Sequence, residues 1–212
     1  MEIRAYSELY IEGAQNILGH MFDFALNEVG LSPDDFAGRF VVSSYSKQFS
    51  RGNVTYVAGK TGPELARLVL AASGYYGHIP EDIMFIDRSP EYWGGWILAY
   101  YQWLKDYPFG YILSAVPFSK LIEMHNIYHE MDIEHVVNEL DRRINAYYPE
   151  TALRRHRLTC GLSQRELADL SGVAIRQIQL FEQRQRNIRK ASADTILRLS
   201  NVLSCDMEAL ML

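Results

Sequence analysis

Four side chains near the C-terminal end of the chain have types and spacing suited to reading base edges. They are Ile175, Arg176, Gln177 and Gln179. A guanidinium can bridge O6 and N7 of guanine, an amide can pair with adenine, and a branched aliphatic group can touch a thymine methyl. In a helix, Ile175, Arg176 and Gln179 point outward together, with Gln177 to one side. Such a helix would present these groups to a DNA groove.

The preceding residues predict the element that positions this helix. Ser163 and Glu166 form a capping box, which opens a first short helix. Gly172 ends that helix, at a position where a left-handed turn residue is needed and glycine has no steric cost. A second helix is expected from about Ala174 to Gln183. A tight turn between two short helices is the helix-turn-helix arrangement.

The packing of the two helices is also predicted by spacing. Ile178 and Phe181 fall on the inward face of the second helix, and Leu167 lies on the inward face of the first. Ala168 is small enough to let the helices approach closely where it meets Ile178. The alternative is a helical hairpin that only packs. The capping box, Ala168, Gly172 and Ile178 all in register favour the helix-turn-helix over it.

Residues 151–212 resemble the Xre/Cro-type, lambda-repressor-like DNA-binding domain. The matching residues are Leu-Ser-Gln-x-Glu-Leu-Ala at 162–168, Ser-Gly-Val at 171–173 and Ile-x-x-x-Glu at 178–182. The resemblance implies five helices, double-stranded operator DNA as partner, and a homodimer that reads two half-sites. It also implies that Gln164 contacts a phosphate and braces the recognition helix.

Two residues depart from the pattern of this family. Ala174 occupies a position where many members have Ser or Thr, so the side-chain cap of the recognition helix is lost. Arg184 stands where many members have glycine after that helix, which puts the geometry of the turn in doubt. Arg184 can still contact a phosphate.

Basic side chains flank the recognition helix on both sides. Arg154, Arg155 and Arg157 make the first helix of this domain basic, and the loop after recognition carries further Arg and Lys residues suited to the DNA backbone. The residues expected to contact DNA are Arg154, Gln164, Ile175, Arg176, Gln177, Gln179, Arg184 and Arg186.

Charge is divided unevenly along the 212 residues. The chain has a net charge of −5, but residues 151–212 carry ten basic and six acidic side chains, which is +4. The remainder is therefore −9. Only the C-terminal part has the electrostatics for a polyanion, and the acidic part is expected to bind something else.

Residues 1–148 are expected to form a separate domain of about six helices, followed by a DNA-binding domain over 149–212. The first helix should span 6–29, continuous or broken at Gly13 or Gly19. Residues 54–57 could form a short strand or an extended link, and 75–86 a loop with a short helix or strand. The fold class is therefore mainly all-α.

An aromatic helix begins at Ser89. Trp96, Tyr100 and Trp103 recur at helical spacing, and Trp93 precedes them. Such a stripe usually belongs to a core or a protein-binding groove, because aromatic residues dominate core burial. The alternative is a ligand or nucleotide pocket. Trp93, Trp96 and Tyr100 are the candidate partner or ligand residues of this domain.

Catalytic and metal-binding motifs are not evident. His125 and His129 are four residues apart, but a third ligand at fixed spacing is not apparent, so solvated or capping histidines are favoured over zinc. Gly59-Lys-Thr61 lacks the earlier glycine of a phosphate-binding loop. No nucleophile elbow is visible. We expect no enzyme activity, metal or cofactor.

Two cysteines and the hydropathy pattern indicate the compartment. Cys160 and Cys205 form no metal-type pair and are expected to be buried, reduced thiols. Neither a signal peptide nor an apolar run of about 20 residues is seen. The sequence therefore predicts a cytoplasmic protein without a membrane span.

Three functional hypotheses follow from the sequence. The first is a sequence-specific transcriptional regulator that acts as a dimeric repressor, with its own promoter as one target. The second is an antitoxin that neutralises a toxin through the N-terminal domain and autoregulates through the helix-turn-helix. The third is a regulator whose N-terminal domain senses a small-molecule effector at the aromatic helix.

Overall fold

The computed structural model describes residues 4–81 and 88–212, and every regular element within these ranges is a helix. The all-α prediction is confirmed. The chain divides into two compact units, Met1–Ile144 and Asn145–Leu212. Within the described ranges, no helix combines the length and apolar character that a bilayer crossing requires.

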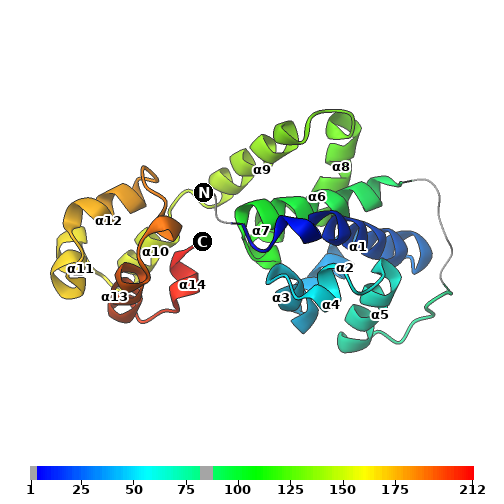
Figure 1. Cartoon of the computed structure of the whole chain (residues 1–212), viewed down its shortest axis with the longest axis horizontal. Helices are drawn as coiled ribbons and strands as arrows, with labels where there is room; N and C mark the ends of the chain where they lie inside the picture. The colour runs from blue at the N-terminus through cyan, green and yellow to red at the C-terminus, as the bar shows by residue number, and fades with distance from the viewer. Residues whose placement is uncertain (1–3, 82–87) are drawn as a thin grey trace. The chain divides into compact units, whose positions relative to one another are not determined.

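The N-terminal unit contains more helices than the sequence predicted. Instead of about six, its described residues form nine α-helices, because short segments such as α3, α4 and α7 are helical too. The elements shown in Figure 1 are η1 (Glu8–Tyr10), α1 (Ile11–Asp23), η2 (Phe24–Glu28), α2 (Pro33–Val42), α3 (Ser44–Ser50), α4 (Val54–Val57), α5 (Gly62–Ala72), α6 (Pro90–Lys105), α7 (Phe109–Ala115), α8 (Phe118–Tyr128) and α9 (Ile133–Tyr147).

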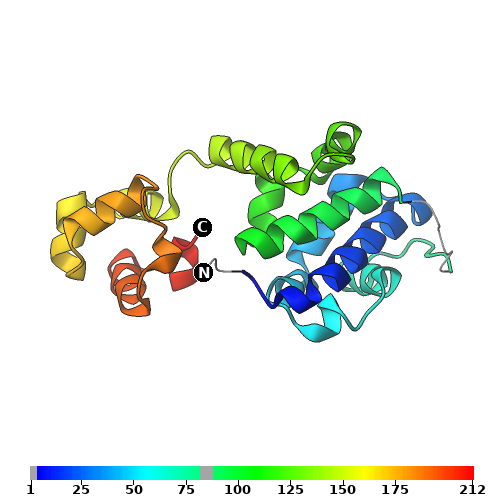
Figure 2. The same ribbon diagram turned by 45° about the horizontal axis from the view of Figure 1, so that its top comes forward.

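Helices α1 and α6 lie side by side at the centre of the N-terminal unit (Figures 1 and 2). Their close approach depends on glycine: a Cβ atom added at Gly19 would lie 2.7 Å from the ring of Tyr92, and one added at Gly95 would collide with the Leu18 backbone. Helix α1 does not break at Gly13 or Gly19. The α-helical pattern of backbone hydrogen bonds changes only after Asp23, where a π-helical turn, η2, begins.

An aromatic core holds the neighbouring helices against this pair. Phe22 of α1 stacks on Phe118 of α8 with ring centroids 3.7 Å apart. Phe22 also meets Phe36 and Phe40 of α2 edge to face, and Phe40 contacts Phe109 of α7. Aromatic pairs in these geometries add to the stabilisation from burial. These rings explain why α2, α7 and α8 pack together around α1.

Side-chain caps set the starts of two helices in the N-terminal unit. The Thr61–Glu64 capping box is present, with Thr61 N donating to Glu64 Oε2 over 2.7 Å. The expectation of a strand or extended link at residues 54–57 is wrong, because Asn53 Oδ1 accepts from Thr55 N and starts the short helix α4. Residues 75–81 lie outside regular elements, and residues 82–87 of the predicted loop lie outside the described residues.

The C-terminal unit is a five-helix bundle, as the resemblance implied. Its apolar core is built from Leu153, Leu167, Ile178 and Leu199, each at most 1% exposed, together with neighbours from all five helices. Leu210, near the end of the chain, belongs to this core. The elements are α10 (Ala152–Thr159), α11 (Gln164–Ser171), α12 (Ile175–Glu182), η3 (Ile188–Lys190), α13 (Ala193–Leu203) and α14 (Met207–Leu210).

Candidate nucleic-acid interface

The turn between α11 and α12 has the geometry that its residues predicted. Ser163 N donates to Glu166 Oε2 over 2.8 Å, and Glu166 N donates to Ser163 Oγ over 3.1 Å, which completes the capping box. These bonds hold the pKa of the Glu166 carboxyl below its usual value. Gly172 ends α11 in the left-handed region at φ 68°. The chain then turns through Val173 into α12.

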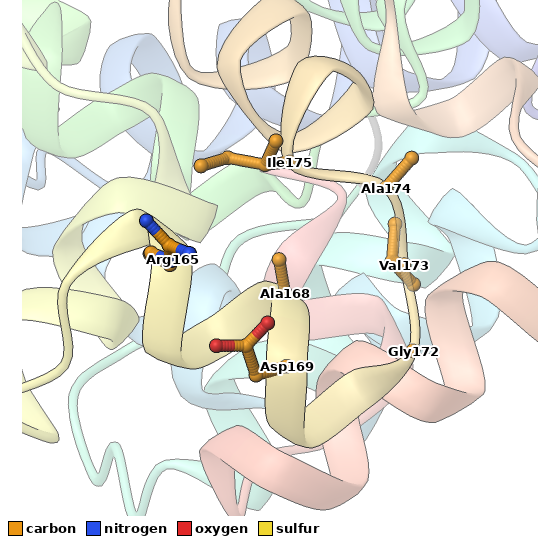
Figure 3. A pocket seen from close by; sticks show the side chains of 7 residues that line it. All are labelled: Arg165, Ala168, Asp169, Gly172, Val173, Ala174 and Ile175. Carbon is orange, nitrogen blue, oxygen red and sulfur yellow. The ribbon is translucent and has the colours of Figure 1, made fainter.

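A surface hollow of about 570 Å³ lies between the two helices (Figure 3). Arg165, Ala168 and Asp169 of α11 line one side, and the turn and the start of α12, including Ala174 and Ile175, line the other. The small side chain of Ala168 keeps this space open. Ala174 provides no side-chain cap for α12, as predicted.

Helix α12 has one anchored face and one free end. Ile178 and Phe181 are buried at 0% and 3% exposure, as expected for the inward face. At the other extreme, Ile175 is 41% exposed and Arg176 is exposed as well. Gln177 and Gln179 are half-buried, as is Leu180. The first turn of α12 is therefore the part that offers side chains to solvent.

A buried ion pair ties α12 to the first helix of the unit. Arg157 Nε donates to Glu182 Oε1 over 2.7 Å, and Arg157 Nη2 donates to Glu182 Oε2 over 2.9 Å. Gln164 Nε2 of α11 donates to the same Oε2 over 2.8 Å. A bidentate Arg–carboxylate pair fixes geometry as well as adding energy. One carboxylate thus joins α10, α11 and α12.

This pair corrects one expectation and refines another. Arg157 was expected to extend a basic surface over the first helix, but it is 7% exposed and is occupied by Glu182 and by the carbonyl of Leu162. Gln164 was expected to brace the recognition helix, and its bond to Glu182 is such a brace. The sequence analysis did not predict that Glu182 is buried. Its position four residues after the inward-facing Ile178 could have indicated this, because residues i and i+4 share a helix face.

The remaining basic candidates lie at the surface. Arg154 is exposed and its Nε lies 3.2 Å from Glu150 Oε1. Arg184 adopts the left-handed conformation at φ 57°, where glycine is common, and donates from Nη2 to the carbonyl of Tyr148 over 2.5 Å. Arg186, in the loop that follows, and Lys190, at the end of η3, are exposed.

The cysteines differ from the prediction. Cys160 is exposed, whereas Cys205 is half-buried and packs against the apolar core of the C-terminal unit. Cys160 is the C-cap residue of α10. Burial also raises the pKa of the Cys205 thiol.

Candidate residues of the N-terminal unit fall into two groups. Trp93 and Trp96 line a hollow with His125 and His129, whereas Tyr100 is not among its lining residues. Trp93, Trp96 and Tyr100 are half-buried, and only Trp103 of the predicted stripe is buried, at 6% exposure. Of the predicted stripe, Trp103 therefore lies in the core, and the half-buried Trp93, Trp96 and Tyr100 stay candidates for contact with a partner or ligand. In the described ranges, no group of three or more His, Cys, Asp or Glu could hold a metal ion.

Comparison with known families identifies the C-terminal unit. Residues 153–210 match the family model described as Helix-turn-helix. The unit is a helix-turn-helix domain of the Xre/lambda-repressor-like family, preceded by a helical N-terminal region. No curated protein and no solved structure matches the chain. This match supports a DNA-binding regulator.

Proposed function

We propose that this chain is a sequence-specific transcriptional repressor that binds its operator as a dimer, with α12 as the recognition helix. The observation that carries the proposal is the contrast within α12. Its C-terminal half is fixed by Ile178, Phe181 and Glu182, while Ile175 and Arg176 at its start are exposed. Base recognition requires a helix that is fixed to the domain on one side and has side chains free to enter the DNA groove on the other.

The two kinds of contact are assigned to different residues. Base edges would be read by Ile175, Arg176, Gln177 and Gln179, through the thymine methyl, guanine and adenine contacts open to these side chains. Phosphates would be contacted by side chains around this helix, which fix the register without reading sequence. These are Arg154, Gln164, Arg184 and Arg186.

Gln164 needs a specific arrangement to serve both roles. Its Nε2 already donates to Glu182 Oε2. An amide nitrogen carries two N–H donors, so the second can reach a phosphate oxygen while the first is kept by Glu182. The brace would then position the phosphate contact.

Dimerisation is proposed because one unit of this size presents few base contacts. A single small module reads too little sequence for tight specific binding, whereas two half-sites one helical turn apart multiply the contacts. The operator is then expected to be palindromic. Repression would follow from occlusion of the promoter by the bound dimer.

The test is enrichment of fragmented host genomic DNA by the full-length protein at two salt concentrations. We expect enrichment of a palindrome upstream of the protein's own gene, weaker at the higher salt because phosphate contacts release counterions. The test variant is Arg176→Ala, at an exposed side chain, which should lose the sequence preference. No enrichment over a scrambled competitor would overturn the proposal.

The charge division supports a second candidate, an antitoxin. Residues 151–212 carry +4 and the remainder −9, so the N-terminal unit is suited to a basic protein partner. Co-purification with the product of an adjacent gene, together with poor growth of a strain that lacks only this gene, would favour it. Normal growth of that strain would count against it.

A further inference from the structure

A hollow of about 370 Å³ lies in the N-terminal unit, bounded by α6, α8 and the start of α9. We call it the aromatic hollow. Trp93 and Trp96 of α6, His125 and Tyr128 of α8 and Ile133 of α9 contribute to its walls. Its volume falls in the range of small-molecule sites, which span roughly 300–1,000 Å³. The walls come from three helices, so the hollow is formed by the fold and not by one loop.

Flat ring systems form two walls of the aromatic hollow. The indole of Trp93 meets the ring of His125 edge to face at 5.6 Å, and the rings of His125 and His129 are stacked at 4.3 Å. On the next turn of α6, Trp96 lies parallel to Tyr100 at 6.4 Å. Half-buried indoles held in fixed orientations can stack against a planar ligand at little entropic cost.

The two histidines of these walls are oriented by contacts with each other and with Trp93. His129 Nδ1 donates to the carbonyl of His125 over 2.7 Å, which orients its ring. Burial lowers the pKa of His125, the neighbouring His129 lowers it further, and Glu91 opposes both. The lowered pKa favours the uncharged imidazole of His125, which has one nitrogen that donates and one that accepts a hydrogen bond.

The charge of the lining is opposite to that of the surrounding unit. Residues outside 151–212 carry −9, yet the described residues that line the hollow include the guanidinium of Arg88 and no carboxylate. Arg88 is exposed, and its guanidinium lies over the ring of Tyr92 at 5.3 Å from the centroid.

Two carboxylates lie near the aromatic hollow, and one of them contacts a histidine of its lining. Glu91 Oε2 accepts from Asn27 Nδ2 over 3.3 Å, and Glu130 Oε1 lies 3.6 Å from His129 Nε2. Neither is part of the lining. The lining therefore offers one cationic group, the Arg88 guanidinium, to an anion.

We propose that the aromatic hollow binds a small planar aromatic carboxylate, with its ring system against Trp93 and Trp96 and its carboxylate on Arg88. Planar bidentate recognition of a carboxylate is the chemistry in which Arg excels. The proposal concerns the N-terminal unit alone and does not depend on DNA binding. It assigns this unit a ligand in addition to the operator bound by the C-terminal unit.

The test uses the full-length protein and three probes that share one ring system: 2-naphthoate, its neutral amide, and the cationic 2-naphthylmethylamine. Isothermal titration is expected to show binding of the carboxylate at least about tenfold tighter than that of the amine. Arg88→Gln should weaken binding of the carboxylate by about tenfold and binding of the amide by less than twofold. Trp96→Leu should weaken both.

Matched controls separate the site from the rest of the surface. Arg51→Gln removes an exposed guanidinium elsewhere, and Tyr76→Leu removes a ring that is 98% exposed. Both variants should bind 2-naphthoate like the parent chain. The proposal is overturned if 2-naphthoate does not bind up to about 5 mM, a very weak affinity. It is also overturned if the amine binds equally well, or if Arg51→Gln has the same effect as Arg88→Gln.

Discussion

Arg157 and Glu182 form a bidentate ion pair in the interior of the C-terminal unit, with N–O distances of 2.7 and 2.9 Å. Both residues are buried, at 7% and 9% exposure, and they lie 25 positions apart in the chain. Because Glu182 ends α12 and Arg157 lies in α10, the pair holds α12 to α10. Gln164 adds a third helix to the same carboxylate.

Breaking this pair from one side should destabilise the C-terminal unit strongly. Glu182→Ala leaves the Arg157 guanidinium buried without its carboxylate, so we expect a loss of about 3–5 kcal/mol in the free energy of unfolding. The double variant Arg157→Met, Glu182→Leu should recover much of that loss, since it leaves no buried charge. Glu208→Ala, at an exposed carboxylate of the same unit, is the control.

Amide hydrogen exchange of α12 is the measurement for this experiment. All three tryptophans, Trp93, Trp96 and Trp103, belong to the N-terminal unit, so indole fluorescence would not report on the C-terminal one. Equal protection in Glu182→Ala and Glu208→Ala would show that the pair does not hold the helix.

The same carboxylate makes stability depend on pH. Burial alone would raise the pKa of Glu182, but hydrogen bonds from Arg157 and Gln164 outweigh it and hold the pKa below its ordinary value of 4.5. A depressed folded-state pKa gives stability that is fully present above the unfolded-state pKa and is lost as pH falls through the lower folded-state value. The free energy of unfolding of the C-terminal unit should therefore fall below about pH 4.

Denaturant unfolding is measured at several pH values between 7 and 3. Hydrogen exchange of the α12 amides reports the unfolding of the C-terminal unit at each pH. Glu182→Gln removes the titrating group, so its stability should be lower at pH 7 and should change less with acidification. A parallel pH dependence in the variant and the parent chain would assign the acid sensitivity to other carboxylates.

Base-reading and backbone-contacting arginines should respond differently to truncation. Arg176→Ala is expected to lose discrimination at one base position, at a cost of roughly 1–3 kcal/mol, because that contact depends on the base. Arg186→Ala should weaken all sequences about equally and reduce the salt slope of binding by about 1. Binding of operator variants at several salt concentrations distinguishes the two. Unchanged affinity and specificity in Arg176→Ala would mean that another face of α12 reads the bases.

The missing cap of α12 can be restored. Ala174 occupies the N-cap position with extended backbone angles, φ −54° and ψ 131°, but has no side-chain acceptor. Ala174→Ser supplies a hydroxyl that can accept from a free N–H of the first turn, and should add about 1 kcal/mol of stability. Ala193→Ser, one position inside α13 where Ser192 already caps, should change it by less than about 0.5 kcal/mol. Thermal unfolding compares the two, and equal melting temperatures would refute the capping argument.

Expectations for the N-terminal unit were less complete, for reasons visible in single residues. Leu9 falls at helical spacing with the inward positions of α1, yet it is 81% exposed, because the chain before α1 is only a short η1 turn. Residues 54–57 have side chains that favour strands, but they form the short helix α4 because the Asn53 side chain accepts a hydrogen bond from Thr55 N and caps it. Weak local preferences give way to packing and capping in such short segments.

The sequence by itself determined the helix-turn-helix. Ser163 and Glu166 are three positions apart, and Gly172 needs only its own backbone freedom, so local chemistry sets the helix start and its end. Tertiary structure decided which charged and aromatic side chains are covered. Arg157 is buried while Arg154 is exposed, because only Arg157 meets a carboxylate from a distant helix. The cost of burying a charge depends on its partner, and that partner is set by the fold.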